Sequence, residues 1–284
     1  MALAWGSARA HTADETAMQP WHLQWSFEPR VLICLAVSAG LYVVGLVRLW
    51  GHTSGGRGVR PVQALAFAAG WAVLLAALVS PLDQLGGQLF SAHMIQHELL
   101  MIVAAPLLVL GRPLAAWAWA LPLRWRRACG AFFHAPAWRA PWLVVTSPLS
   151  AWVLHALALW VWHVPRFFEA ALASETVHAF QHIAFLLTAL LFWWSIFGAV
   201  TRKHQGIALI SLFTTMVHTG ALGALLTLSQ VAWYASYAVT APAYGLTALE
   251  DQQVGGLVMW VPAGLAYLIA GLVLAARWLE RPRS

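Results

Sequence analysis

The segment 91–110 reads SAHMIQHELLMIVAAPLLVL, and it joins two features that a membrane environment normally keeps apart. It is about 20 residues long and mostly apolar, which is enough to cross about 30 Å of hydrocarbon as a helix. It also opens with His93 and His97, which lie on one helix face with Cβ atoms about 5–6 Å apart. Polar side chains in hydrocarbon are costly, so we expect these histidines to have a function.

A second segment repeats the pattern. His178-Ala179-Phe180-Gln181-His182 has the same H-x-x-Q-H spacing and also opens a long apolar run. Histidines spaced i, i+4 on a helix are close enough to hold one metal ion together. The repeated phrase therefore predicts metal handling within a membrane.

The composition supports an integral membrane protein. The 284 residues are 61% hydrophobic and only 9% charged, and the mean hydropathy is +0.71. A soluble globular domain carries about a quarter charged residues. The formal net charge is +6, but the arginines lie in short loops between apolar runs, so we expect no nucleic-acid partner. The sequence has two cysteines and no CxxC, which supports neither a thiolate zinc site nor a disulfide framework.

We expect an all-α, polytopic fold with seven transmembrane helices embedded in the lipid bilayer. The predicted division is a tail at 1–30, a seven-helix domain at 31–278 and a short tail at 279–284. The seven apolar runs cover residues 31–50, 61–80, 91–110, 147–164, 177–200, 206–229 and 252–278. Segment 112–146 mixes tryptophans, arginines and prolines, which predicts an interfacial position along the headgroups.

The basic residues predict the orientation. Of the 16 lysines and arginines, all but Arg9, Arg30 and Arg166 fall in one set of loops, which is therefore predicted to be cytoplasmic. The N-terminus and the tail 1–30 are then extracytoplasmic, whereas segment 112–146 and the C-terminus are cytoplasmic. With this orientation, His93, His97, His178 and His182 all gather near the extracytoplasmic face.

Three further side chains extend the predicted site inward. His218 lies near the middle of the sixth run, and Met259 lies about two turns below Asp251 in the seventh. Imidazole with thioether suits copper, and a thioether favours Cu(I), whereas zinc more often recruits thiolates or carboxylates. A single intramembrane histidine can instead serve a helix–helix hydrogen bond, a methionine can serve packing, and Asp251 can orient a histidine rather than bind metal. The candidate metal ligands are His93, His97, His178, His182, His218, Met259 and Asp251.

The sequence offers no support for enzymatic chemistry. It contains no nucleophile elbow, phosphate-binding loop, HExxH phrase or carboxylate pair. We therefore expect a protein that is not an enzyme and has no catalytic residues.

Several phrases resemble a known family. Ser80-Pro81-Leu82-Asp83, the run from Phe90 to His97, and the continuation Ala105 to Pro113 resemble the CtaG-type cytochrome c oxidase assembly proteins of bacteria. The phrase LYVVGL at 41–46, the second H-x-x-Q-H phrase and EDQQVGGLVMW at 250–260 also match. The similarity runs over all seven runs, from about Trp21 to Trp278.

The resemblance implies a client. Members of this family are associated with building a caa-type haem–copper oxidase, and are thought to serve copper insertion into its catalytic subunit. It implies a bacterial cytoplasmic (inner) membrane location, the oxidase catalytic subunit as a partner, and a copper-supplying chaperone as a donor. The expected cofactor is Cu(I).

Three other functions remain open at this point. Intramembrane histidines on different helices can also hold a b-type haem in a membrane oxidoreductase. A copper or proton-coupled transporter would need ligands that continue to the cytoplasmic side, and the inner halves of runs three and five are apolar. An assembly scaffold that holds an oxidase subunit without any metal is the third.

Overall fold

The computed structural model describes residues 24–52, 58–198 and 202–280, and all its regular elements there are helices. Most of the tail predicted at 1–30 and the last four residues lie outside the described residues. The all-α prediction is confirmed for the described part of the chain. No strand occurs within these ranges.

The third apolar run is the centre of the helical bundle. It is divided into α4 (Phe90–Glu98), the π-helix η1 (Leu99–Ala104) and α5 (Ala105–Leu110). Of the 18 residues in its most apolar stretch, 61% are buried, whereas the corresponding share in the other candidate spans is 17–39%. Pro106 lacks an amide hydrogen, and Ala105 N–H donates to the carbonyl of Leu100, five residues back, which is the π-helical pattern.

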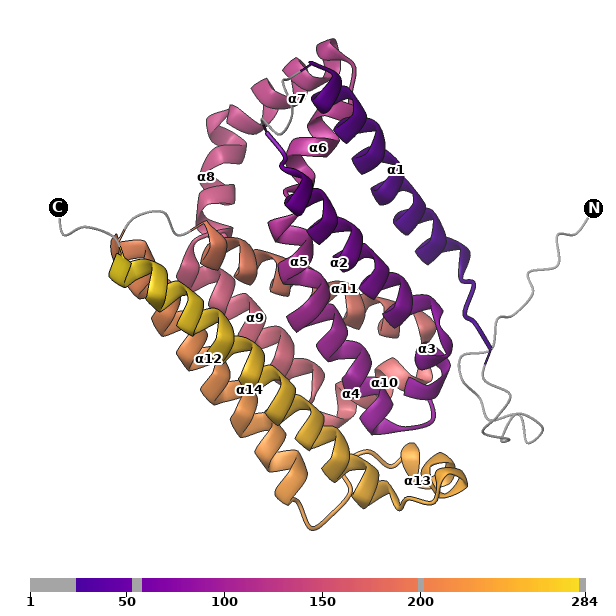
Figure 1. Ribbon diagram of the computed structural model, residues 1–284. Helices are drawn as coiled ribbons and strands as arrows, with labels where there is room; N and C mark the ends of the chain where they lie inside the picture. Colours follow the sequence, from indigo (N-terminus) through magenta and orange to yellow (C-terminus); the bar gives the residue numbers. More distant parts are fainter. Residues whose placement is uncertain (1–23, 53–57, 199–201, 281–284) are drawn as a thin grey trace, which may run out of the picture.

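Three long helices pack directly on this centre, and two further helices pack on those three (Figure 1). Helix α2 (Pro61–Val79) lies against η1 and α5, and α11 (Glu175–Phe197) lies against the same two elements. Helix α14 (Ala248–Glu280) packs on α4 and, along most of its length, on α12 (Arg202–Leu228). Helix α9 (Pro148–Trp162) fills the space between α11 and α12.

Within residues 24–52, 58–198 and 202–280, six helices are long and apolar enough to cross a membrane, and the count becomes seven if one bent pair is taken as a span. The predicted run 147–164 forms only the 15-residue α9, because Pro148 begins it and Pro165 follows its end. It reaches span length only together with α8 (Pro136–Val145), which meets it at a 62° bend. The protein is thus a multi-pass membrane protein, and the seven-helix count depends on that bend.

Segment 112–146 forms α6 (Pro113–Ala120), α7 (Leu123–His134) and then α8. Helix α6 packs lengthwise on α1 (Pro29–His52), where Trp117 Nε1 donates to Ser38 O at 3.0 Å and Arg48 donates to Ala120 O at 2.5 Å. Helices α7 and α8 contain no buried residue. An interfacial position stays a prediction for α7 and α8, whereas α6 is part of the helical bundle.

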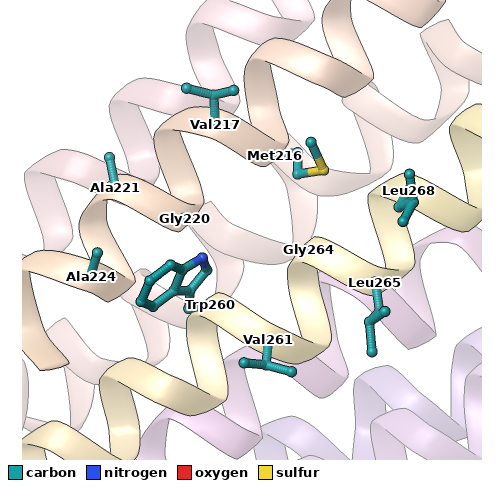
Figure 2. A pocket seen from close by; sticks show the side chains of 10 residues that line it. All are labelled: Met216, Val217, Gly220, Ala221, Ala224, Trp260, Val261, Gly264, Leu265 and Leu268. Carbon is teal, nitrogen blue, oxygen red and sulfur yellow. The ribbon is translucent and has the colours of Figure 1, made fainter.

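Helices α12 and α14 approach each other closely at two glycines. A Cβ atom on Gly256 would lie 2.4 Å from Thr227 Oγ1 and 2.7 Å from Gly223 O, and one on Gly223 would lie 2.8 Å from Gly256 O. Small residues of this kind let membrane helices pack backbone to backbone. Further along the pair the helices leave an apolar groove, shown in Figure 2, where a Cβ on Gly264 would meet open space.

Gly256→Ala is expected to lower the free energy of unfolding by about 1–3 kcal/mol, because the new methyl group must displace the backbone of α12. The thermal unfolding midpoint in detergent micelles measures this change. Gly264→Ala on the same helix is the matched control and should leave the midpoint unchanged or slightly raised. Equal effects of the two substitutions would contradict the close packing described here.

Candidate metal centre

One end of the bundle is covered by short helices that join the long ones (Figure 1). These are α3 (Pro81–Gly86), α10 (Pro165–Ala173), α13 (Tyr237–Thr240) and the 3-10 helix η2 (Ala241–Tyr244). Helix α3 turns back onto α4, and α10 packs against α11. The first turns of α4 and α11, which carry the two H-x-x-Q-H phrases, therefore lie at this end.

The four histidines of these phrases come together. The ring centroids of His93 and His97 are 4.3 Å apart, and those of His178 and His182 are 4.2 Å apart. Across the two helices, His93 lies 5.2 Å from His178, and His97 lies 5.4 Å from His182. One ligand nitrogen each from His93, His178 and His182 lie within 4.8 Å of one another. Metal–imidazole bonds are about 2.0 Å, so small ring rotations would bring all three onto one ion.

His163 joins this group as a fifth imidazole. It caps the end of α9, is 2% exposed, and its ring centroid lies 6.4 Å from that of His97. The candidate set derived from the sequence omitted it. The signal was its position at the predicted outer end of the fourth run, but no spacing rule connects a lone histidine to pairs on two other helices. We call His93, His97, His163, His178 and His182 the histidine cluster.

Hydrogen bonds fix which nitrogens of the cluster can act as ligands. His93 Nδ1 donates to the carbonyl of Gly86 at 3.3 Å, and His163 Nδ1 donates to the carbonyl of Leu159 at 2.7 Å. A carbonyl oxygen only accepts, so each Nδ1 carries the proton and each Nε2 keeps a lone pair. Orientation of a ligand histidine by a bond from its other nitrogen is typical of metal sites.

Four of the five histidines have ring nitrogens without a hydrogen-bond partner among the described residues. Within the described ranges, the Nε2 atoms of His93, His163 and His182 and both ring nitrogens of His97 are buried without a hydrogen bond. An unsatisfied buried polar atom costs about 1–3 kcal/mol, so a cluster of them in a native interior calls for a ligand. Five neutral imidazoles without a carboxylate among them suit a soft, singly charged ion.

Buried phenylalanines line one side of the histidine cluster, and a partly buried histidine forms its other side. Phe168 and Phe185, both 0% exposed, line it at 5.0 Å from His93 and 4.6 Å from His97, measured between ring centroids. His178 is only partly buried and forms the edge nearest the surface. An ion would therefore reach His178 first and pass to the fully enclosed His93 and His97.

Asp251 lies next to the cluster, but its carboxylate already accepts hydrogen bonds from other groups. Its carboxylate accepts from Phe90 N at 2.6 Å, Ser91 N at 3.0 Å and Ser91 Oγ at 2.5 Å. Leu89, the N-cap residue of α4, provides no side-chain cap, so Asp251 caps this helix from α14. This capping role differs from the two roles that the sequence allowed for Asp251, which are to bind metal and to orient a histidine.

His218 and Met259 lie apart from the cluster. Met259 is 2% exposed and packs with Met94, Phe90 and Phe168 in an apolar aromatic group. His218 makes its ring contact with Trp152 on α9. The seven sequence-derived ligands are thus divided: the four paired histidines meet, Asp251 caps α4 beside them, and His218 and Met259 lie apart from the cluster.

Two buried tyrosines fasten the covering segments. Tyr237 OH donates to Gly86 O, the carbonyl that also binds His93, and Tyr234 OH donates to His163 O, both at 2.9 Å. Burial raises the pKa of both phenols, and for Tyr237 the charges of Asp251 and Glu169 raise the pKa further. Both hydroxyls therefore stay protonated and continue to donate throughout the neutral range.

Asp251→Ala should lower the free energy of unfolding by about 2–4 kcal/mol, because it leaves two backbone amides of α4 without an acceptor inside the protein. Thermal unfolding in detergent is the measurement. Glu250→Ala, which removes an exposed neighbour bonded only to Thr247, serves as the control and should have a smaller effect. A stable Asp251→Ala variant would contradict the capping role.

The fold and site define a multi-pass membrane protein with a buried histidine cluster at one end of its helical bundle. A family model described as cytochrome c oxidase caa3 assembly factor matches residues 40–281. The chain therefore belongs to the family of caa3-type cytochrome c oxidase assembly factors, which confirms the resemblance seen in the sequence.

Two relatives are mycobacterial. An uncharacterized protein of Mycobacterium bovis is 25% identical over 272 residues, covering 89% of this chain and 40% of that protein. An uncharacterized protein of Mycobacterium leprae is 27% identical over 272 residues, with coverages of 90% and 40%. The chain thus spans 40% of the length of these relatives. No solved structure matches the chain.

Proposed function

We propose that this oxidase assembly factor binds Cu(I) in the histidine cluster and delivers it to the catalytic subunit of a haem–copper oxidase. The observation that carries the proposal is the set of buried ring nitrogens on His93, His97, His163 and His182 that have no partner within the described residues. Copper is the ion that the chain carries, and the chain catalyses no reaction of it.

The donor set favours Cu(I) over divalent ions. Born desolvation costs grow with the square of the charge, so a divalent ion among neutral imidazoles in a dry site is far more costly than a monovalent one. Zinc sites usually recruit thiolate or carboxylate ligands that would offset this cost. Here the carboxylate of Asp251, which lies near the cluster, already accepts three hydrogen bonds.

The geometry does not favour haem. A porphyrin between two axial histidines requires a slab-shaped space between the rings. In the cluster, neighbouring imidazoles pack at 4.2–6.4 Å between centroids, and Phe168 and Phe185 close on them. A haem would have to push these rings apart, whereas a single ion needs only imidazole nitrogens at about 2.0 Å.

The orientation completes the proposal. The excess of lysine and arginine at the opposite end of the bundle supports an extracytoplasmic position for the histidine cluster in a bacterial inner membrane. A copper-supplying chaperone outside the membrane would then load the cluster at His178. The oxidase subunit would receive the ion from a side of the bundle that contacts it.

Purified protein loaded anaerobically with Cu(I) should contain near-stoichiometric copper in the histidine cluster and no iron by elemental analysis. His97→Ala/His182→Ala should lose this copper, because it removes one imidazole from each helix. His134→Ala, an exposed histidine on α7 that bonds to Gly130 O, is the control and should load normally. Iron in place of copper would favour the haem alternative, and full copper loading of the double variant would contradict the cluster as the site.

In a bacterium lacking the gene, the wild-type chain should restore caa3-type oxidase activity and the copper content of the catalytic subunit. His97→Ala/His182→Ala, expressed in the membrane at the same level, should restore the subunit protein but leave it low in copper. Full restoration by the double variant would indicate a metal-free scaffold instead.

A further inference from the structure

Helices α7 and α8 bury none of their residues, unlike the other helices that the structure describes. They lie at the end of the bundle opposite α10 and α13 (Figure 1). Helix α8 leads into α9 through a 62° bend, so its axis turns away from the direction in which α9 runs. The two helices thus form a surface beside the ends of the long helices, and no described part of the chain covers it.

Each of the two helices has an apolar face made of aromatic rings. Trp125 and Phe132 lie two turns apart on one face of α7, and Trp138 and Trp142 lie one turn apart on one face of α8. The ring centroids of Phe132 and Trp138 are 5.0 Å apart, so the two faces are continuous. All four side chains are 49–55% exposed. They form one apolar patch across both helices, which marks an interaction surface.

The same segment is strongly basic. Residues 112–146 contain five arginines and no aspartate or glutamate. Three of these arginines, Arg124, Arg127 and Arg139, are exposed, and none of them forms an ion pair with a described residue. The apolar patch is therefore accompanied by three positive charges that the chain does not neutralise.

Arg126 determines which side of α7 faces the bundle. Its guanidinium lies over the ring of Trp119 on α6, 4.1 Å from the centroid. Neighbouring residues on an α-helix are about 100° apart, so Trp125 lies to one side of Arg126 and Arg127 lies to the other. Aromatic and charged side chains thus occupy opposite flanks of α7. This is the arrangement of a helix that lies in a headgroup layer, with its rings in the apolar layer below.

We propose that α7 and α8 form a docking surface for anionic phospholipid, with the aromatic patch at the acyl-chain boundary and Arg124, Arg127 and Arg139 on headgroup phosphates. Charge complementarity carries the choice of lipid, because the surface holds only positive charge. A bilayer offers both requirements in one place: phosphates and, about 5–10 Å deeper, an apolar layer. The sequence predicts an interfacial position, and the structure adds a lipid class and the residues that select it. The proposal is independent of the histidine cluster.

Hydrogen–deuterium exchange of the full-length protein in lipid nanodiscs tests this surface. Peptides from residues 123–145 should exchange more slowly in discs that contain phosphatidylglycerol than in discs of phosphatidylcholine alone. Each arginine near an anionic surface contributes about 5-fold, so Arg127→Gln/Arg139→Gln should lose about 25-fold of this slowing. In the wild type, about 1 M salt should remove most of it, because the screening length falls to about 3 Å.

Arg60→Gln/Arg277→Gln is the matched control. It removes two exposed arginines of α2 and α14 at the same end of the bundle, outside the docking surface, and should keep the full effect of phosphatidylglycerol. The thermal unfolding midpoint in detergent shows whether each variant is folded. The salt dependence of the wild type tests the proposal even if a variant unfolds.

Two outcomes would overturn the proposal. Equal exchange of residues 123–145 in the two kinds of disc would show that the surface does not select anionic lipid. Slowing that occurs only after the oxidase catalytic subunit is added to the discs would assign the surface to a protein partner instead. Slowing by phosphatidylglycerol that is lost in Arg127→Gln/Arg139→Gln and kept in Arg60→Gln/Arg277→Gln would support it.

Discussion

The hydrogen bonds from the first amides of α4 to Asp251 are the interaction on which the site depends. A helix that begins inside a bundle has no water to satisfy its first N–H groups, and Leu89 offers no side chain for them. Asp251 supplies the missing acceptor from α14, 160 residues away in sequence from Ser91. Because α14 is packed tightly on α12 through Gly223 and Gly256, this one carboxylate joins the histidine helix to a rigid helix pair.

Several ring nitrogens of the histidine cluster have no hydrogen-bond partner within the described residues, whereas other polar side chains nearby do. The amide of Gln96 donates to Ala77 O and to Asp83, and Gln252 bonds to Trp233 N, Leu226 O and Val231 O. These bonds hold neighbouring helices together around the site. The carbonyls of Gly86 and Leu159 turn Nε2 of His93 and His163 toward the interior, and neither nitrogen has a hydrogen-bond partner within the described residues. Gln96 Oε1, Glu98 Oε2 and the side-chain amide of Gln181 also lack partners there, so the unsatisfied groups around the site are not histidines alone.

Much of the fold could be predicted from the sequence, because runs of about 20 apolar residues leave few alternatives in a bilayer. The H-x-x-Q-H phrases also predicted correctly that four histidines meet, since i, i+4 spacing fixes one face of a helix. The sequence could not show that α9 is short, because the bend between α8 and α9 depends on how the proline-rich segment packs. It could not show that α6 lies along α1 either.

The roles of single residues were harder to predict, because they depend on contacts between distant helices. His163 and Asp251 illustrate this in opposite directions: one joins the cluster from the end of another helix, and the other caps α4 instead of lying among the imidazoles. Met259 has the depth expected of a ligand, but it packs with aromatic rings. The site that we propose is therefore made of imidazole alone.

The central claim is that the chain binds Cu(I) through imidazole nitrogens alone. X-ray absorption at the copper edge of the Cu(I)-loaded protein tests this claim most directly. The account predicts a nitrogen-only first shell at about 2.0 Å, with the outer-shell scattering typical of imidazole. A sulfur shell at about 2.3 Å would contradict it, because Met259 or another thioether would then be a ligand.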